Sequence, residues 1–436
     1  MLPTLDRTHP DYNAERRGFQ LLDPYEPDLI VPAATADDVR RAVAHAADAG
    51  LSVAVQATGH GLPRTTPGGL LITTGRMNGV TIDPAAATAR VEAGVRWEQV
   101  IEAAARHGLA PLSGSSPDVG AVSYTLGGGI GLLARLYGYA ADQVRAIDVV
   151  TADARLRHVT PESDPDLYWA LVGGRGGFGV VTALEIGLVP VERLYGGALH
   201  FAADLVPAAL RTWADWTAAL PDEMTSSIAI IPFPDLPQVP APLRGRKVAH
   251  IRIAYAGDPE EGADLVRPLR AIGPRLEDTV GEMPYTASGA IHDDPKGPAG
   301  YFATHSLLRE LPPAALDVLL GADSVVEVRH LGGALAKPRS HPNSVGNRDA
   351  LYFAGLLTPG LTPGADTRHL RLAHDGVRQA LTPWATGGRV LNFLYGENAT
   401  PEEVRRAYDP ADRERLTTLK ARWDPSHLFR HGLPPA

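Results

Sequence analysis

The chain has 436 residues, which is long enough for two or three domains. Its hydrophobic content of 44% and charged content of 21% are typical of a globular protein. The net charge is −9 and the basic residues are scattered, which argues against binding to nucleic acid or to an anionic membrane. The chain has no cysteine, so disulfides, thiolate metal sites and cysteine nucleophiles are excluded. The N-terminal residues lack the apolar core of a signal peptide, and we expect a cytoplasmic protein.

The first regular elements form a strand, a helix and a second strand. Residues 28–33 (DLIVPA) predict a short buried strand. Thr35 and Asp38 have the spacing of a capping box, so a helix should begin there. Apolar residues recur on one face of this helix, which should end at Gly50. Residues 52–57 predict the second strand.

The second strand leads into the turn Thr58-Gly59-His60-Gly61. The flanking glycines allow a sharp turn and a close approach by another molecule. Taken alone, a histidine at a strand end is more often a hydrogen-bonded polar residue than a functional one. Two further glycine-rich stretches follow in the same part of the chain, and they favour a functional role for His60.

Short strands and helices alternate through the rest of the first lobe. Residues 70–73 and 80–82 predict two strands joined by an Asn-Gly turn, which is a strong hairpin signal. Residues 89–93 predict another strand, and residues 97–107 predict a helix. The alternation indicates a mixed α and β lobe.

The second glycine-rich stretch covers residues 114–131 (GSSPDVGAVSYTLGGGIG). Successive backbone amides without side-chain obstruction form an anion-binding concavity, which suits a pyrophosphate. A tight turn packed under a helix is an equally good interpretation of these residues.

The third stretch, residues 173–179 (GGRGGFG), formally contains the dinucleotide fingerprint G-x-G-x-x-G. That fingerprint must leave a strand and open a helix. Here the helix predicted by DPDLYWAL precedes the glycines and the strand VVTALEIGLV follows them. This order excludes a Rossmann NAD site.

Four segments occur in a specific order: ATGHG, GSSPDVGAVSYTLGGGIG, AIDVVTADARL and DPDLYWALVGGRGGFGVVT. Over residues 23–190 the chain resembles the flavin domain of berberine bridge enzyme-like oxidoreductases, of the vanillyl-alcohol-oxidase (PCMH-type) flavoprotein family. The resemblance resumes near the C-terminus. It implies an α+β fold with a two-subdomain FAD-binding domain at 1–195 and a substrate domain at 196–385, built from an antiparallel sheet backed by helices. Residues 386–436 should return to the FAD-binding domain.

The resemblance implies that FAD lies between the two subdomains, with its pyrophosphate on backbone amides of the glycine loops. No metal is implied. The residues expected to contact FAD are Thr58, Gly59, His60, Gly61, Gly114, Ser115, Ser116, Val119, Gly120, Gly127, Gly128, Gly131, Gly179, Val181 and Asn392.

In this family the histidine of the Gly-His turn commonly bonds to the flavin 8α-methyl carbon, and here that residue is His60. A neutral imidazole is a capable nucleophile. Many relatives add a second bond through a cysteine in the loop that corresponds to residues 114–120. This chain has Ser116 there, so we expect a single covalent tether.

The second half of the chain has a different pattern. Residues 206–220 and 262–272 predict helices, and residues 228–231 and 248–255 predict strands. The two tryptophans of the first helix are expected in a core. The resemblance implies that this half forms an antiparallel sheet above the flavin.

Residues 324–331 (SVVEVRHL) predict a half-buried strand with one polar face. Glu327, Arg329 and His330 are therefore candidates to face the active site. A surface ion pair with a solvent-exposed histidine is at least as good an interpretation for each residue.

The C-terminal part predicts a strand at residues 389–395 (RVLNFLY) and a helix whose first turn carries Thr400, Pro401 and Glu403. Residues 413–430 resemble the C-terminal helix of the family and its ending.

Many relatives have a tyrosine, acting as catalytic base, two residues before the asparagine that aligns with Asn392. This chain has Val390 there, and valine cannot accept a proton. Either another group replaces the base or the reaction needs none at this position. The candidate replacements are Tyr124, Glu327, His330, Asn347 and Tyr395.

We expect an FAD-dependent oxidoreductase, monomeric or homodimeric, that takes a hydride from a small-molecule substrate and passes the electrons to dioxygen. The missing tyrosine favours a tailoring step on a secondary metabolite over simple sugar oxidation. Two alternatives stay open. One is a flavin-dependent dehydrogenase with another electron acceptor, and the other is a flavin-containing protein that sequesters a toxic ligand without turnover.

Overall fold

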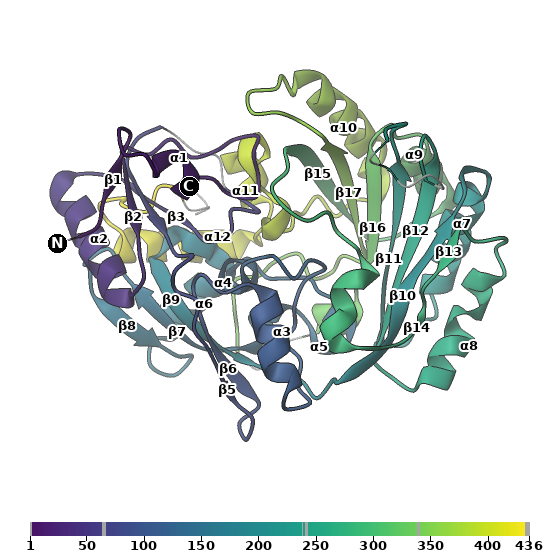
Figure 1. Cartoon of the computed structure of the whole chain (residues 1–436), viewed down its shortest axis with the longest axis horizontal. Coiled ribbons are helices and arrows are strands. Elements are labelled where there is room, and N and C mark those ends of the chain that lie inside the picture. Colours follow the sequence, from purple (N-terminus) through teal and green to yellow (C-terminus); the bar gives the residue numbers. More distant parts are fainter. Residues whose placement is uncertain (1, 63–66, 238, 240–242, 338–340, 432–436) are drawn as a thin grey trace.

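The computed structural model describes residues 2–62, 67–237, 239, 243–337 and 341–431. Two lobes lie side by side (Figure 1). One lobe contains the N-terminal elements and the last two helices, and the other contains a large sheet with helices on its outer side. The mixed α and β class, with an antiparallel sheet backed by helices, is confirmed.

A four-stranded sheet forms the N-terminal part of the first lobe, in the order β1-β2-β4-β3. Its strands are β1 (Leu5–Asp6), β2 (Leu29–Pro32), β3 (Val53–Gln56) and β4 (Leu70–Thr73). Strands β2 and β3 both pair with β4 in parallel. Helix α2 (Ala36–Ala49) begins with the predicted capping box of Thr35 and Asp38, and Gly50 ends it in a left-handed conformation. Its apolar face packs between this sheet and the next one.

A five-stranded antiparallel sheet follows, in the order β5-β6-β9-β7-β8. Its strands are β5 (Val80–Asp83), β6 (Thr88–Glu92), β7 (Val144–Val150), β8 (Leu156–Val159) and β9 (Val180–Gly187). Helices α3 (Trp97–Ala105), α4 (Ala121–Leu126) and α6 (Pro165–Gly174) share its core. As the sequence predicts, the third glycine stretch lies between helix α6 and strand β9.

The predicted hairpin between residues 70–73 and 80–82 is wrong. Strand β4 lies in the centre of the parallel sheet, whereas β5 pairs with β6 in the antiparallel one. The amide of Gly79 donates to the Glu92 side chain at 2.9 Å. The Asn-Gly step therefore carries the chain from one sheet to the other.

The second lobe contains an eight-stranded antiparallel sheet, in the order β13-β10-β12-β11-β16-β17-β15, with β14 also paired to β10. Its strands are β10 (Arg193–Phe201), β11 (Met224–Pro232), β12 (Lys247–Tyr255), β13 (Glu277–Asp278), β14 (Gly281–Pro284), β15 (Tyr301–Leu308), β16 (Val325–His330) and β17 (Tyr352–Pro359). The helices behind it are α7 (Val206–Thr217), α8 (Pro259–Arg270), α9 (Pro313–Leu320) and α10 (Arg368–Ala380).

Alternate residues of each strand point to opposite faces of this sheet. Val326 and Val328 of β16 join the core formed with helices α7, α8 and α9, and Trp213 is fully buried in the same core. Glu327 and Arg329, which alternate with these two valines, therefore lie on the opposite face. We call this the inner face, because it is the side turned toward the first lobe.

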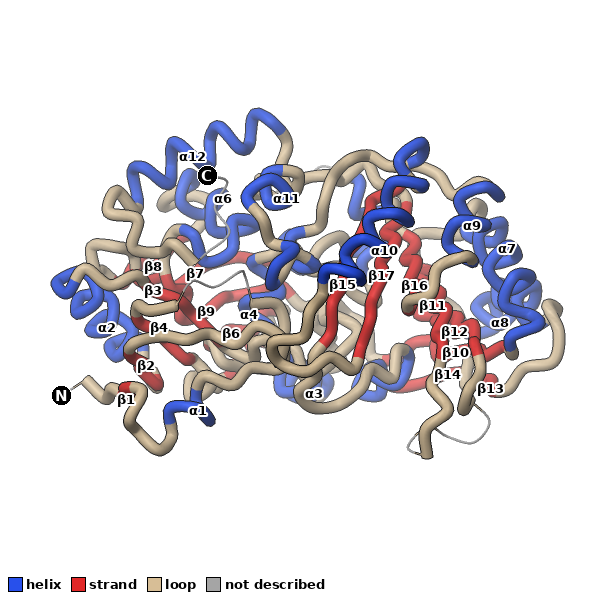
Figure 2. The backbone as a smooth tube through the Cα atoms, turned by 90° about the horizontal axis from the view of Figure 1, so that it is seen from above, coloured by secondary structure: helices blue, strands red, loops and turns tan. Residues whose placement is uncertain are grey.

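The C-terminal segment crosses back to the first lobe (Figures 1 and 2). Residues 389–395 are not the predicted strand, since residues Leu391–Phe393 form the short 3₁₀ helix η7. Helix α11 (Pro401–Arg405) begins with the predicted cap, in which the amide of Glu403 donates to the Thr400 side chain at 3.3 Å. Helix α12 (Pro410–Trp423) packs against α6.

Shorter elements connect these layers. They are α1 (Tyr12–Glu15), α5 (Ala134–Tyr137), η1 (Ala140–Gln143), η2 (Arg175–Gly177), η3 (Ala203–Leu205), η4 (Tyr285–Ile291), η5 (Gly333–Ala336), η6 (Thr382–Trp384) and η8 (Gly396–Asn398).

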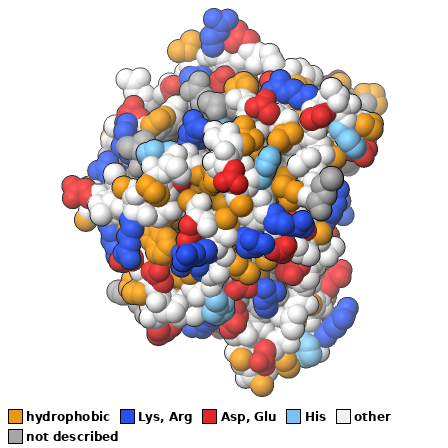
Figure 3. Space-filling model, turned by 90° about the vertical axis from the view of Figure 1, so that its left-hand side faces the viewer, with side chains coloured by type: hydrophobic (Ala, Val, Ile, Leu, Met, Phe, Trp, Pro, Cys, Tyr) orange, Lys and Arg blue, Asp and Glu red, His pale blue; other side chains and the backbone are white. Residues whose placement is uncertain are grey.

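Acidic and basic side chains are interspersed over the face of the molecule shown in Figure 3. Among the residues that the structure describes, no helix combines the length and the apolar character needed to cross a membrane.

Candidate active site

The histidine turn follows strand β3 and is held by the N-terminal segment. The amides of Phe19 and Gln20 donate to the carbonyls of Thr58 and Gly59 at 2.9 and 3.0 Å. Gly59 has φ +70°, and a Cβ at this position would lie 2.5 Å from the Cα of Gly18. Both the backbone conformation and the close contact require glycine there.

Thr58 connects this turn to the second glycine stretch. Its Oγ1 lies 2.9 Å from His60 Nδ1 and accepts a 3.2 Å hydrogen bond from the amide of Gly120. The structure thus brings together two segments that are about sixty residues apart in the sequence. The contact fixes both the orientation of the imidazole and the start of helix α4.

His60 contacts one aromatic residue from each lobe. Its ring stacks on Phe19 with centroids 3.8 Å apart, and the Tyr301 hydroxyl donates to its carbonyl at 3.0 Å. Burial, with a smaller contribution from Arg96, lowers the pKa of His60 to about 4. The imidazole is therefore neutral at pH 7, and its Nε2 is buried without a hydrogen-bond partner among the residues that the structure describes.

Backbone amides of both loops have no protein acceptor within the described part of the chain. These are the amides of Gly59, His60, Gly61, Gly114, Ser115 and Ser116. Free N–H groups in succession form an anion-binding surface of the kind that a pyrophosphate requires. Together with the unpartnered imidazole nitrogen, these donors fit the FAD that the sequence predicts.

The second glycine stretch wraps around Tyr124. A Cβ on Gly114 or Gly129 would lie 2.9 or 2.4 Å from the Tyr124 ring, so glycine is required at both positions. The Tyr124 hydroxyl is buried without a partner. Burial raises the pKa of Tyr124 far above its usual range, so the phenol stays protonated and can donate a hydrogen bond.

Asn392 belongs to the same site. Its Nδ2 donates to the Tyr124 carbonyl at 2.9 Å, and its Oδ1 is buried and unpartnered. A Cβ on Gly127 would lie 2.4 Å from this Oδ1. Helix η7 and the second glycine stretch are therefore in direct contact.

The remaining expected FAD contacts have other surroundings. Gly128 lies against Tyr139 and Val345, whereas Gly179 packs on β7 and Val181 is buried in β9. Ser116 and Val119 belong to the loop before helix α4, in which the Val119 amide donates to the Ser116 carbonyl.

Sequence reasoning did not identify Phe19 or Arg175. The Arg175 Nη2 donates to the Gly61 carbonyl at 3.0 Å, and its Nη1 contacts the carbonyls of Leu391 and Leu394 at 3.4 Å. Arg175 has φ +54°, which is uncommon for a residue other than glycine. Its position in the third glycine stretch was the only feature of the sequence that pointed to a role in this site.

Glu327 lies on the inner face between Arg252, which is buried, and Arg329, whose side chain is 14% exposed. Arg252 Nη1 donates to Oε1 at 2.7 Å, and Arg329 Nη2 contacts Oε2 at 3.0 Å. Burial favours the neutral acid, but the two guanidinium groups outweigh this effect and hold the pKa of Glu327 below its usual range. The carboxylate is ionised with both oxygens engaged, which makes it a poor proton acceptor.

The other candidate bases have structural contacts. His330 bonds to Arg135 at 3.1 Å and stacks on Tyr352, a residue of the helix-facing core. Asn347 Nδ2 donates to the carbonyls of Arg389 and Arg406 at 3.1 and 2.9 Å.

Tyr395 lies beside the histidine turn. Its ring packs edge-on against Tyr301, with centroids 5.4 Å apart, and Tyr301 in turn donates to the His60 carbonyl. Burial raises the pKa of Tyr395 well above its usual value, so its hydroxyl is protonated at neutral pH.

Val390 is held in place by a hydrogen bond from its backbone amide. Its amide donates to His305 Nε2 at 2.9 Å, and His305 lies on the inner face, stacked on Phe353. Because Nε2 is the acceptor, the proton of the neutral His305 ring is on Nδ1. His305 is a further inner-face residue that the sequence did not reveal.

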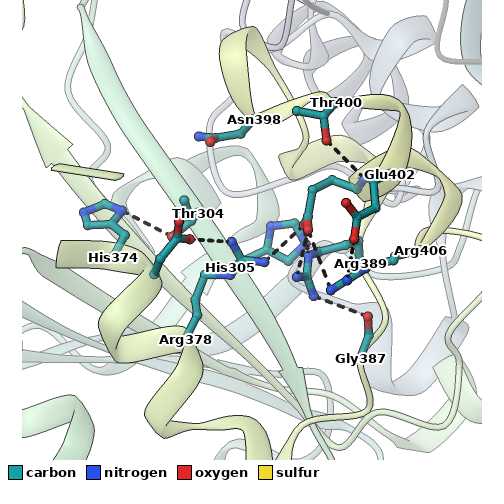
Figure 4. A network of polar contacts seen from close by, with 12 residues as sticks. Thr304, His305, His374, Arg378, Gly387, Arg389, Asn398, Thr400, Glu402 and Arg406 are labelled. Atoms are coloured by element: carbon teal, nitrogen blue, oxygen red, sulfur yellow. Dashed lines mark hydrogen bonds and ion pairs between the residues drawn. The ribbon is translucent and has the colours of Figure 1, made fainter. Parts of the chain in front are cut away.

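An arginine and glutamate network surrounds the segment before η7 (Figure 4). Glu403 accepts from Arg389, which is 6% exposed, and from Arg378 at 3.1 Å. The Arg389 amide also bonds to the Arg406 carbonyl at 3.0 Å. The network borders a cavity of about 190 Å³ and anchors the residue next to Val390.

Comparison with known proteins identifies an FAD-binding domain in the first lobe. Residues 27–160 match the FAD binding domain model named FAD_binding_4. An uncharacterised FAD-linked oxidoreductase of Bacillus subtilis is 27% identical, over 98% of this chain and 96% of its own length. The (R)-6-hydroxynicotine oxidase of Paenarthrobacter nicotinovorans is 28% identical, over 93% of this chain and 90% of its own.

Solved structures show the same fold. The 6-hydroxy-D-nicotine oxidase of Arthrobacter nicotinovorans superposes with a TM-score of 0.83 at 22% identity, covering 100% of this chain and 97% of its own. A xylooligosaccharide oxidase from Myceliophthora thermophila gives 0.84 at 20% identity, covering 100% and 96%. The berberine bridge enzyme-like protein 1 of Physcomitrella patens gives 0.83 at 18% identity, covering 100% and 97%.

The matched domain identifies an FAD-binding protein, and the glycine loops and the neutral histidine fit that cofactor. The chain has the fold of the berberine bridge enzyme-like, PCMH-type flavoproteins. It is an FAD-linked oxidoreductase.

Proposed function

We propose that the chain is an FAD-dependent oxidase that removes a hydride from a small-molecule substrate and delivers the electrons to dioxygen. The observation that carries the proposal is the neutral, unpartnered imidazole of His60 between two loops of free amides. Relatives and structural neighbours named as oxidases of hydroxynicotine and of oligosaccharides support it. One structural neighbour is instead named as a glucose dehydrogenase, and one relative as an FAD-dependent monooxygenase.

The two loops and Asn392 would hold FAD, and His60 would form the single covalent bond to its 8α-methyl carbon. When bound, FAD supplies the two-electron acceptor. Thr58 orients the imidazole, and Tyr301 fixes the His60 backbone from the opposite lobe. Ser115 and Ser116 present amides, and no cysteine is available for a second bond.

The inner face of the large sheet would bind the substrate opposite these loops. Tyr124 would act as a hydrogen-bond donor, because its phenol is protonated and unpartnered. Glu327 would hold Arg252 and Arg329 in place and would not act as the base, since both its oxygens are engaged. We therefore propose a reaction that needs no tyrosine at position 390.

Acid precipitation of the purified protein tests the tether. We expect yellow flavin in the pellet of the wild type and of His45→Ala, an exposed histidine of helix α2. In His60→Ala the flavin should be released into the supernatant. Flavin that stays in the pellet of His60→Ala would show that another residue forms the bond.

The electron acceptor can be tested without knowing the substrate. The flavin is reduced anaerobically with dithionite, the excess reductant is removed, and dioxygen is admitted. An oxidase should reoxidise within seconds and release one hydrogen peroxide per flavin. Slow reoxidation by dioxygen, with fast reoxidation by a dye, would instead identify a dehydrogenase.

A further inference from the structure

We propose that the substrate carries a carboxylate and that Arg252 and Arg329 bind it on the inner face of the large sheet. The proposal rests on the proposed function, because it names the substrate class of the same site. The two arginines come from strands β12 and β16, which flank strand β11.

The strand register places the two arginines in one row. Ser227 of β11 is opposite Arg252 of β12 and also opposite Arg329 of β16. Neighbouring strands lie about 4.8 Å apart, so the arginine Cα atoms are separated by roughly 10 Å, with a small side chain between them. Two guanidinium groups can therefore converge above Ser227.

Several polar atoms around this row have no hydrogen-bond partner in the described part of the chain. The Nε of Arg252 and the Nε of Arg329 are both buried and unbonded, and so are the hydroxyls of Thr225 and Ser227. Arg252 is only 7% exposed. Buried donors without an acceptor are costly, by about 1–3 kcal/mol each. A ligand rich in acceptor oxygens would satisfy them.

Unused guanidinium donors leave room for an anion. Glu327 engages Nη1 of Arg252 and Nη2 of Arg329, whereas both Nε atoms lack a partner among the described residues. His292 is 3.8 Å from Glu327, but burial lowers its pKa well below the usual value and it is neutral. Asp294 is the other acid that interacts electrostatically with both arginines. It is half-buried, and its carboxylate accepts a hydrogen bond from the Ser115 hydroxyl at 2.8 Å.

The row borders the expected flavin site. The cavity at the two arginines is also lined by Ser115 and Gly131 of the second glycine stretch. The Arg329 guanidinium lies 5.2 Å from the Phe393 ring of η7, next to Asn392. The cavity is small, about 20 Å³, so the arginine side chains must move apart as the ligand enters.

A carboxylate suits this arrangement better than another anion because it is planar. The planar fork of arginine pairs with it through two parallel hydrogen bonds. Phe393 and Phe353, which pack against Arg329, offer an apolar surface for the rest of the substrate.

The test compares benzoate with benzamide, a neutral molecule of the same shape, as ligands of the FAD-loaded protein. Flavin absorbance and titration calorimetry measure their dissociation constants. Benzoate should bind at least about tenfold more tightly, the typical effect of a charge-assisted hydrogen bond. Arg329→Met and Arg252→Met should abolish the preference. Arg193→Met, an exposed arginine of the same sheet, should keep it.

Glu327→Gln separates the proposal from a general loss of structure, because a damaged fold would weaken binding and would not tighten it. Removing the competing negative charge should tighten benzoate binding and leave benzamide unchanged. Benzoate that binds no better than benzamide, a preference retained in both arginine variants, or weaker benzoate binding in Glu327→Gln would overturn the proposal. If either arginine variant does not fold, Glu327→Gln and Arg329→Lys decide the question. Loss of covalent flavin or of dioxygen reactivity would instead refute the proposed function.

Discussion

Glu403→Gln should destabilise the protein, because it removes the negative charge that pairs with Arg389, the residue before Val390. Glu403 is the only carboxylate paired with Arg389, whose side chain is 6% exposed, among the residues that the structure describes. Breaking one half of a buried ion pair costs about 3–5 kcal/mol, and glutamine keeps part of the hydrogen bonding, so we expect about 3 kcal/mol. The unfolding entropy of a chain this long is about 0.9 kcal/mol per kelvin, which gives a fall in Tm of about 3 °C.

Glu402→Gln is the matched control. Glu402 precedes Glu403 on helix α11, but its side chain is 69% exposed. Among the described residues its ion-pair partner is Arg406 (Figure 4), which is also exposed. Exposed ion pairs contribute about 0.2–1 kcal/mol, so its Tm should change by less than about 1 °C. Differential scanning calorimetry of the two variants and the wild type makes the comparison. Equal melting temperatures for all three would refute the reasoning.

The effect of Glu403→Gln should depend on pH. Burial raises the pKa of Glu403, but its hydrogen bonds and ion pairs with arginines outweigh this and hold the pKa below the ordinary value of 4.5. A depressed carboxyl pKa stabilises the fold at pH values above the unfolded pKa. The difference between wild type and variant should therefore be complete above about pH 4.5 and disappear as the pH falls through the folded pKa.

Three further predictions concern single contacts. Thr58→Val removes the hydrogen bond to His60 and should slow covalent flavin attachment about fivefold. The rate is measured as the fraction of flavin in acid pellets over time. An unchanged rate would contradict the orienting role of Thr58. Asn392→Ala should weaken FAD binding, measured as faster release of flavin from the His60→Ala background, and equal release rates would exclude contact with FAD. Asp424→Asn should lower the free energy of unfolding, measured in urea, by about 3 kcal/mol, because Asp424 is fully buried and paired with Lys420. A change below about 0.5 kcal/mol would show that this ion pair does not stabilise the fold.

The sequence predicts well wherever the signal is local. The helix caps at Thr35 and Thr400 need only a few neighbouring residues. The structure has the full capping box at Thr35, and at Thr400 it has the bond from the Glu403 amide to the threonine side chain. The helix, glycine and strand order around residues 173–179 is local as well, and the structure has the same order. Failures occurred where a distant partner decides the conformation. Strand β4 pairs with β2 and β3 in place of the next strand along the chain, which removed the predicted hairpin.

Residues 389–395 illustrate the same limit. Their apolar composition predicts a strand, but His305 takes the Val390 amide, and the side chain of Asn392 bonds to the Tyr124 carbonyl. Because these contacts hold the segment on both sides, it does not pair with a neighbouring strand. Residues Leu391–Phe393 form the short helix η7 instead.

By itself the sequence determined the chemistry that is possible: a histidine between glycines, loops of unobstructed amides, no cysteine and no tyrosine at position 390. Only the tertiary structure decided which of these groups meet. Thr58 reaches both His60 and Gly120, and the register of three strands sets Arg252 and Arg329 on either side of Ser227. Local patterns show which face of a strand is polar, but only long-range pairing fixes which polar residues stand side by side.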